Sequence, residues 1–168
     1  MRDLSETCLR IAEVKARAVD AQSPQVMKET VDRIHDANPI PARNAVWVIT
    51  HFHDVQVACL RNRQSEFMAL AMHTSNSSLR RLLLNVIERQ TIQPQEMDAD
   101  FLDFCFSHMV SPAETPGIQS LCMKLAFQQS RHYPELLHEF NETLSLMQDG
   151  YAVSVMTLRK KLLKQSET

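Results

Sequence analysis

The hydrophobic positions of the chain follow a helical spacing that returns at regular intervals. Within Pro41–Asp54 the apolar residues recur at i, i+3, i+4 and i+7, which places them on one face of an α-helix. Comparable segments begin at Ser77, Pro116 and Tyr151, so that successive starts are 36, 39 and 35 residues apart. A period of this length is filled by two helices, and it indicates an α-solenoid.

Prolines mark where several of these helices begin. A proline is tolerated at the first position of a helix because its missing N–H has no partner there in any case. Four prolines stand at predicted helix starts: Pro24, Pro41, Pro116 and Pro134. The chain has only two glycines, and both lie at predicted helix ends, Gly150 in the position after a helix that favours a positive φ. So little glycine disfavours tight hairpins, and we predict an all-α fold.

The sequence predicts a helix at each end of the chain, and the C-terminal one is predicted to cap the repeats. We expect the first helix over residues 5–21, with Asp3 and Glu6 resembling a capping box. Its predicted apolar stripe consists of Leu9, Ala12, Ala16 and Val19. The last helix, from Ala152 to about Lys164, is more polar, as a capping helix must be. We therefore predict about four helical pairs and a C-terminal capping helix in a single domain over residues 1–168.

The period, the prolines and a Tyr-Pro-Glu-Leu stretch at Tyr133–Leu136 together resemble HEAT or armadillo-type repeats, over nearly the full length of the chain. The chain is similar to small bacterial HEAT-like proteins. This resemblance implies a right-handed α-α superhelix whose second helices line the concave side. It also implies a non-enzymatic role in binding or scaffolding.

Composition excludes several other classes. No window approaches 18 uninterrupted apolar residues, so no membrane span is expected, and the N-terminus lacks the hydrophobic run of a signal peptide. We therefore expect a cytoplasmic protein. The four cysteines have no paired spacing, and we predict that they are buried, reduced thiols rather than disulfides or zinc ligands. They are Cys8, Cys59, Cys105 and Cys122.

Charge divides unevenly between the two kinds of helix. The first helices and the cap sum to about +7, and the second helices sum to −8. If the second helices lie inside, the later half of the concave surface is acidic. The candidate binding residues on this surface are Asp100, Asp103, Glu135, Glu139 and Glu142. One hypothesis is an electronegative groove for a basic peptide or protein segment. The alternative is a solvated helix face that only keeps the molecule soluble.

Patterns that would indicate catalysis are weak. Glu135 and His138 match the Glu-x-x-His unit of di-iron bundles, but such a site needs a second copy, which this sequence lacks. We expect no metal, no cofactor and no catalytic residue, and we read the histidines as structural or solvated. The competing function is that of a HEAT-like DNA-binding protein or a DNA glycosylase-type enzyme. Nucleic acid requires a basic inner surface, and the predicted acidic one disfavours it.

Overall fold

The computed structural model describes residues 8–148 and 150–166, which are helical and contain no strand. The prediction of an all-α fold of paired helices is confirmed. The chain divides into two compact units, Met1–Gln90 and Thr91–Thr168, each described by itself. This division falls after the helix that we predicted to begin at Ser77. Whether the chain behaves as a single domain stays a prediction.

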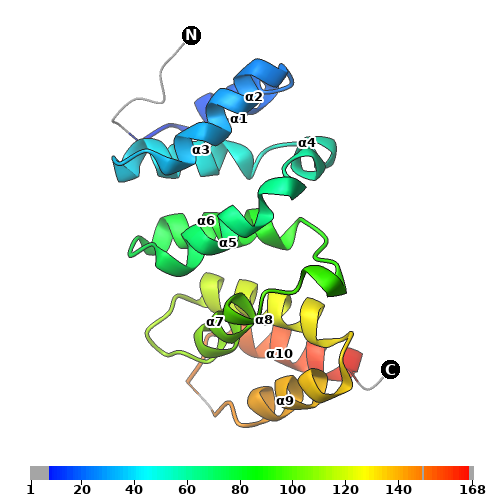
Figure 1. The fold of residues 1–168 in the computed structure, drawn as a ribbon. Coiled ribbons are helices and arrows are strands. Elements are labelled where there is room, and N and C mark those ends of the chain that lie inside the picture. The colour runs from blue at the N-terminus through cyan, green and yellow to red at the C-terminus, as the bar shows by residue number, and fades with distance from the viewer. Residues whose placement is uncertain (1–7, 149, 167–168) are drawn as a thin grey trace. The chain divides into compact units, whose positions relative to one another are not determined.

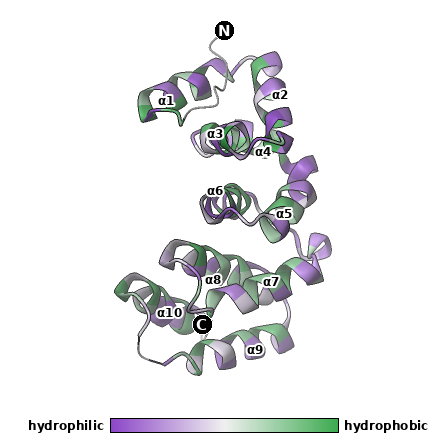
Figure 2. Ribbon diagram, turned by 90° about the vertical axis from the view of Figure 1, so that its left-hand side faces the viewer, coloured by the Kyte–Doolittle hydropathy of each residue, from purple (hydrophilic) through white to green (hydrophobic). Residues whose placement is uncertain are grey.

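Unit 1 consists of two layers of helices. One layer contains α1 (Ile11–Asp20), α3 (Pro39–Ile49) and α6 (Ser77–Glu88). The other contains α2 (Pro24–Asp32), α4 (Asp54–Cys59) and α5 (Gln64–His73), with short 3-10 turns η1 (Arg33–His35) and η2 (Arg61–Arg63). Figure 2 shows the two layers edge-on, and α3 packs against both α1 and α6.

Unit 2 repeats the same two-layer arrangement. It opens with the 3-10 turn η3 (Pro94–Glu96). Helices α7 (Ala99–Met109) and α9 (Pro134–Ser145) form one layer, while α8 (Pro116–Ser130) and α10 (Val153–Ser166) form the other. Helix α8 is central, because it packs against α7, α9 and α10 (Figure 1). The surface of α7 and α9 is therefore set by how these helices pack on α8.

Each unit has its own hydrophobic core. The largest fully buried side chains of unit 1 are Ile49, Phe67, Leu83, Leu84 and Ile87. In unit 2 they are Phe101, Met109, Ile118, Met123, Leu125 and Phe140. In that second core, Phe140 of α9 contacts Phe127 of α8, with ring centroids 5.6 Å apart, and Phe106 of α7 edge-on at 6.2 Å. One aromatic side chain thus joins three helices.

A similar hydrogen bond occurs at corresponding positions of two of the repeating segments. Arg80, near the start of α6, donates to the carbonyl oxygens of Ala71 and Thr74 at the end of α5 (3.1 and 2.6 Å). Gln119, 39 residues later in α8, donates from Nε2 to the carbonyl oxygen of Ser111 after α7 (2.8 Å). The last carbonyl groups of a helix have no partner within it, so these side chains satisfy them from the next helix.

Our expectation for the first helix was wrong in its buried face. Helix α1 buries Val14 and Ala18, whereas Ala12, Ala16 and Val19 of the predicted stripe are exposed. The helix begins at Ile11. The residue before it, Arg10, donates its backbone N–H to Glu13 Oε2 (2.8 Å). The predicted capping box of Asp3 and Glu6 lies outside the described residues. Several alanines made two faces of this helix equally apolar in sequence.

The segment after Asp54 is divided into α4 and α5 by the turn Arg61–Arg63. One further expectation, that of four buried cysteines, needs correction. The cysteines are free, but only Cys105 and Cys122 are buried, whereas Cys8 and Cys59 are exposed. Cys59 is the last residue of α4, where the break in the helix turns it to the surface.

Candidate functional site

The five predicted binding residues lie on the exposed sides of two helices of unit 2. Asp100 and Asp103 are exposed on α7. Glu135, Glu139 and Glu142 are exposed on α9. Each group is on the side of its helix opposite the buried residues, which are Phe101, Leu102, Cys105 and Met109 on α7 and Phe140 and Leu144 on α9.

The core holds these two acidic surfaces in the same layer. Phe106 on α7 meets Phe140 on α9 edge to face, and the hydroxyl group of Tyr133, just before α9, donates to the carbonyl oxygen of Pro94, ahead of α7 (3.0 Å). Both contacts are independent of the acidic side chains. Helices α7 and α9 are thus connected through α8 and the Phe106–Phe140 contact without using the charges. We refer to the five acidic residues on the two helices together as the acidic face.

Three members of the acidic face have a local structural explanation. Asp100 and Glu135 lie in the first turns of α7 and α9, where the helix dipole stabilises a negative charge. Next to Asp100, the side chain of Asp98 caps α7 by accepting a hydrogen bond from the N–H of Phe101 (2.9 Å). Glu142 lies 3.4 Å from Nε2 of His138 one turn earlier.

Asp103 and Glu139 differ from these three. Both are exposed, both lie beyond the first turn of their helices, and neither side chain makes a hydrogen bond or ion pair with any of the described residues. Glu139 is also one helical turn from Glu135, a like-charge spacing that slightly destabilises a helix. The fold gives no reason for a negative charge at either position.

Comparison with known families decides the class of the chain. A family model described as a HEAT repeat domain matches residues 4–166. The chain belongs to the HEAT repeat domain family. Proteins of this HEAT family generally mediate protein interactions or scaffolding and are generally non-enzymatic. No match was found among curated proteins or among solved structures.

In this HEAT repeat chain, some arginines bond to the carbonyl groups at the ends of neighbouring helices. Arg89 after α6 donates to the carbonyl oxygens of Thr50 and Phe52 (3.0 and 2.7 Å) and to Asp54 Oδ1 (2.9 Å). Arg159 of α10 donates from Nε to the carbonyl oxygen of Leu144 at the end of α9 (2.5 Å). The sequence did not predict the bonds of Arg89 and Arg159. For the similar bonds of Arg80 and Gln119, their 39-residue spacing, which matches the repeat, was a signal.

Charged side chains also join the two pairs of helices in unit 1. Arg63 donates from Nε to Glu66 Oε2 (2.6 Å) and from a terminal nitrogen to Asp32 Oδ1 (3.3 Å), while His35 Nε2 contacts Glu66 Oε1. The hydrogen bond from Arg63, helped by His35, lowers the pKa of Glu66 below its ordinary value. These residues link the end of α2 and η1 to α5.

Unit 2 offers little for metal or thiol chemistry. No group of three or more potential metal-ligating side chains occurs among the residues that the structure describes, and His138 turns to Glu142. Burial, with a contribution from neighbouring Cys122, raises the pKa of the Cys105 thiol, so it stays protonated and unreactive. None of the helices, within the described ranges, is long and apolar enough to cross a membrane.

Proposed function

We propose that this HEAT repeat chain is a protein-interaction module that binds a basic segment of a partner protein on the acidic face of unit 2. The observation that carries the proposal is that the side chains of Asp103 and Glu139 are exposed and make no bond to any of the described residues. A basic ligand would give both residues a partner.

The balance of charge within unit 2 supports the same partner. Residues 91–168 contain 10 Asp and Glu against 6 Lys and Arg. A surface of one sign attracts oppositely charged segments and accelerates their association, by an amount that falls as salt screens the field. We therefore propose that long-range electrostatic attraction first brings the basic segment to unit 2. Contacts with the carboxylates of α7 and α9 then hold the bound segment in place.

Nucleic acid binding has no comparable support in this unit. Phosphate recognition depends on several free cations on one surface. Arg159, one of the six cations of unit 2, is engaged with the end of α9. The acidic face would repel phosphate, so an enzyme acting on DNA would need a surface elsewhere.

A titration followed residue by residue tests this proposal. We would add hexalysine peptide to isotope-labelled protein in 50 mM salt and record the backbone amide signals. We expect saturable shifts in α7 and α9 around Asp103 and Glu139, reduced several-fold in 300 mM salt. Shifts spread evenly over the molecule, or none in these helices, would leave the acidic face as a solvated surface.

A further inference from the structure

A cluster of four charged or titratable side chains joins two helical pairs of unit 1. Arg63, in the turn η2, donates to both carboxylate oxygens of Glu66 in α5, from Nε to Oε2 and from a terminal nitrogen to Oε1 (2.6 Å each). The same side chain donates to Asp32 Oδ1 of α2 (3.3 Å), and Nε2 of His35 in η1 contacts Glu66 Oε1. We call these four residues the Glu66 cluster. Its bonds link α2 and η1 to η2 and α5.

The Glu66 cluster lies among side chains of mixed charge. The elements that form it carry further charged or titratable side chains, which are Lys28, Glu29, Arg33, Asp36, Arg61 and His73. The helices packed against these elements, α3, α4 and α6, carry Arg43, Asp54, Arg80, Arg81 and Glu88. Arg43 donates to Ser78 Oγ (3.1 Å), and Arg80 donates to carbonyl groups at the other end of α5. Glu66 is the carboxylate that contacts both Arg63 and His35.

The segment on one side of this cluster buries few side chains of its own. Helix α2 buries Thr30 and Val31, and η1 buries Ile34. By comparison, α3 buries seven of its 11 residues. A segment with few buried apolar contacts opens at a lower free energy than a core helix does. The bonds of the Glu66 cluster therefore make up a larger share of what holds α2 and η1 in place.

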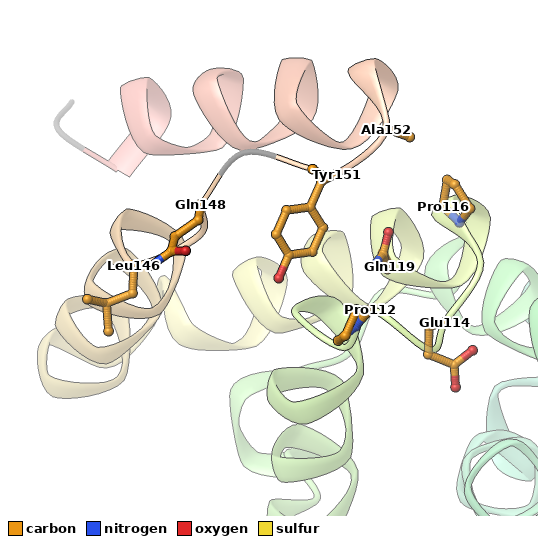
Figure 3. Close-up of a pocket in the computed structure, with 9 residues that line it drawn as sticks. Pro112, Glu114, Pro116, Gln119, Leu146, Gln148, Tyr151 and Ala152 are labelled. Carbon is orange, nitrogen blue, oxygen red and sulfur yellow. The ribbon is translucent and has the colours of Figure 1, made fainter.

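Two joints between helices in unit 2 are made by uncharged donors instead. The hydroxyl group of Tyr151 donates to the carbonyl oxygen of Val110 (2.7 Å), and the amide group of Gln119 donates to that of Ser111 (2.8 Å). Figure 3 shows both side chains near Pro112, which follows Ser111. A phenol hydroxyl and an amide stay uncharged in acid, so these bonds do not respond to protonation as a carboxylate does.

We infer that the Glu66 cluster is an acid-sensitive latch that holds α2 and η1 against α5. Protonation of Glu66 removes the negative charge that Arg63 and His35 share. Arg63 and a protonated His35 then face each other from two elements without an anion between them, and they repel each other. The end of α2 and η1 opens, while α3 stays folded. This inference concerns unit 1 and does not rest on binding at the acidic face.

The direction of the pH dependence follows from the contacts of Glu66. The hydrogen bond from Arg63, helped by His35, lowers the pKa of Glu66 in the folded state. A carboxylate of this kind adds stability above its unfolded pKa, and that stability is lost as the pH falls through the folded pKa. The latch is therefore closed near neutral pH and is released in acid.

Amide hydrogen exchange of the full chain, expressed as protection factors, tests the inference. Glu66→Gln keeps the shape of the protonated side chain at a pH where the wild type is ionised. At pH 6 it should lower the protection of residues 31–36 about fivefold, equivalent to roughly 1 kcal/mol in the opening equilibrium. The control is Glu29→Gln on the same helix, whose carboxylate accepts from Gln25 of α2 and not from α5. It should change the same protection factors less than about twofold.

Acid supplies the second arm of the test. Between pH 6 and pH 3 the wild type should lose protection at residues 31–36, Glu66→Gln should lose less, and α3 should keep its protection in both. Unchanged protection in Glu66→Gln at pH 6 would overturn the inference, because the charge of Glu66 would then hold nothing in place. An equal loss in α3 and in residues 31–36 would also overturn it, since unit 1 would then open as a whole.

Discussion

The two units of this HEAT repeat chain use their charged residues differently. Unit 1 has 12 Lys and Arg against 10 Asp and Glu, and many of these side chains join helices, as Arg63 does between Asp32 and Glu66. Unit 2 has 6 against 10, and five of its acidic residues lie on the exposed sides of α7 and α9. In unit 1 several charged side chains bond between helices, whereas in unit 2 the side chains of Asp103 and Glu139 bond to none of the described residues.

This difference shows why net charge is a poor guide to function in a helical repeat. The chain has a net charge of −2, which suggests no preference for any partner. The basic excess of unit 1 is largely engaged with carbonyl groups and carboxylates, so it does not form a free cationic surface of matching strength. The ligand surface that we propose is therefore defined by the local acidic residues of α7 and α9 and not by the net charge.

The largest expected effect tests whether the two units are independent. Phe140→Ala removes the ring that joins α7, α8 and α9, and loss of such a buried ring typically costs about 3–5 kcal/mol. Phe67→Ala, in the core of unit 1, is the matched control. Hydrogen exchange during urea unfolding would measure both. A single domain requires each variant to destabilise both units in one transition, and two separate transitions would contradict that prediction.

The next effect concerns a charge that we assign to the fold. Arg89→Met removes hydrogen bonds to two carbonyl groups and to Asp54, and should lower the free energy of unfolding by about 2 kcal/mol. Arg81→Met, at an exposed position of α6, should change it by less than about 0.5 kcal/mol. Thermal unfolding followed by circular dichroism measures the difference. Equal effects would mean that Arg89 is not a structural charge.

A smaller effect depends on pH. Because Arg63 and His35 lower the pKa of Glu66 in the folded state, this carboxylate contributes stability that is present above its unfolded pKa and is lost as the pH falls. The free energy of unfolding of the wild type should therefore drop more than that of Glu66→Gln between pH 6 and pH 3, by about 1 kcal/mol. Urea unfolding at both values checks this, and parallel curves would refute it.

Much of the fold could be predicted from the sequence because its signals are local. Prolines and apolar spacing gave helix starts such as those of α2, α8 and α9, whose first residues are Pro24, Pro116 and Pro134. The buried face of α1 could not be predicted, because alanines leave two candidate faces and only packing against α3 selects one. The break at Arg61–Arg63 was missed for a similar reason, since no proline or glycine marks it.

The acidic residues could be identified from sequence, but their individual roles could not. Helical spacing was enough to place Glu135, Glu139 and Glu142 on one face. Separating Glu139 from Glu142 required the position of the His138 ring, which contacts Glu142 one helical turn away. Helical spacing places His138 near both positions of the chain, and only the side-chain conformation shows which carboxylate it contacts.

The smallest effect on stability belongs to the residues with the largest expected effect on binding. The double variant Asp103→Asn/Glu139→Gln should keep the free energy of unfolding within about 0.5 kcal/mol of wild type, because neither side chain has a partner in the described part of the chain. Its control is Asp20→Asn/Glu29→Gln in unit 1, which changes the net charge by the same amount. Urea unfolding establishes that both variants are folded.

The most direct test of the account is the affinity of these two variants for labelled hexalysine, measured by fluorescence anisotropy in 50 mM salt. We predict that Asp103→Asn/Glu139→Gln raises the dissociation constant about tenfold, equivalent to roughly 1.4 kcal/mol, while the unit 1 variant raises it less than twofold. Equal weakening by the two variants would mean that only net charge matters. Unchanged affinity in the unit 2 variant would contradict the acidic face as a binding site.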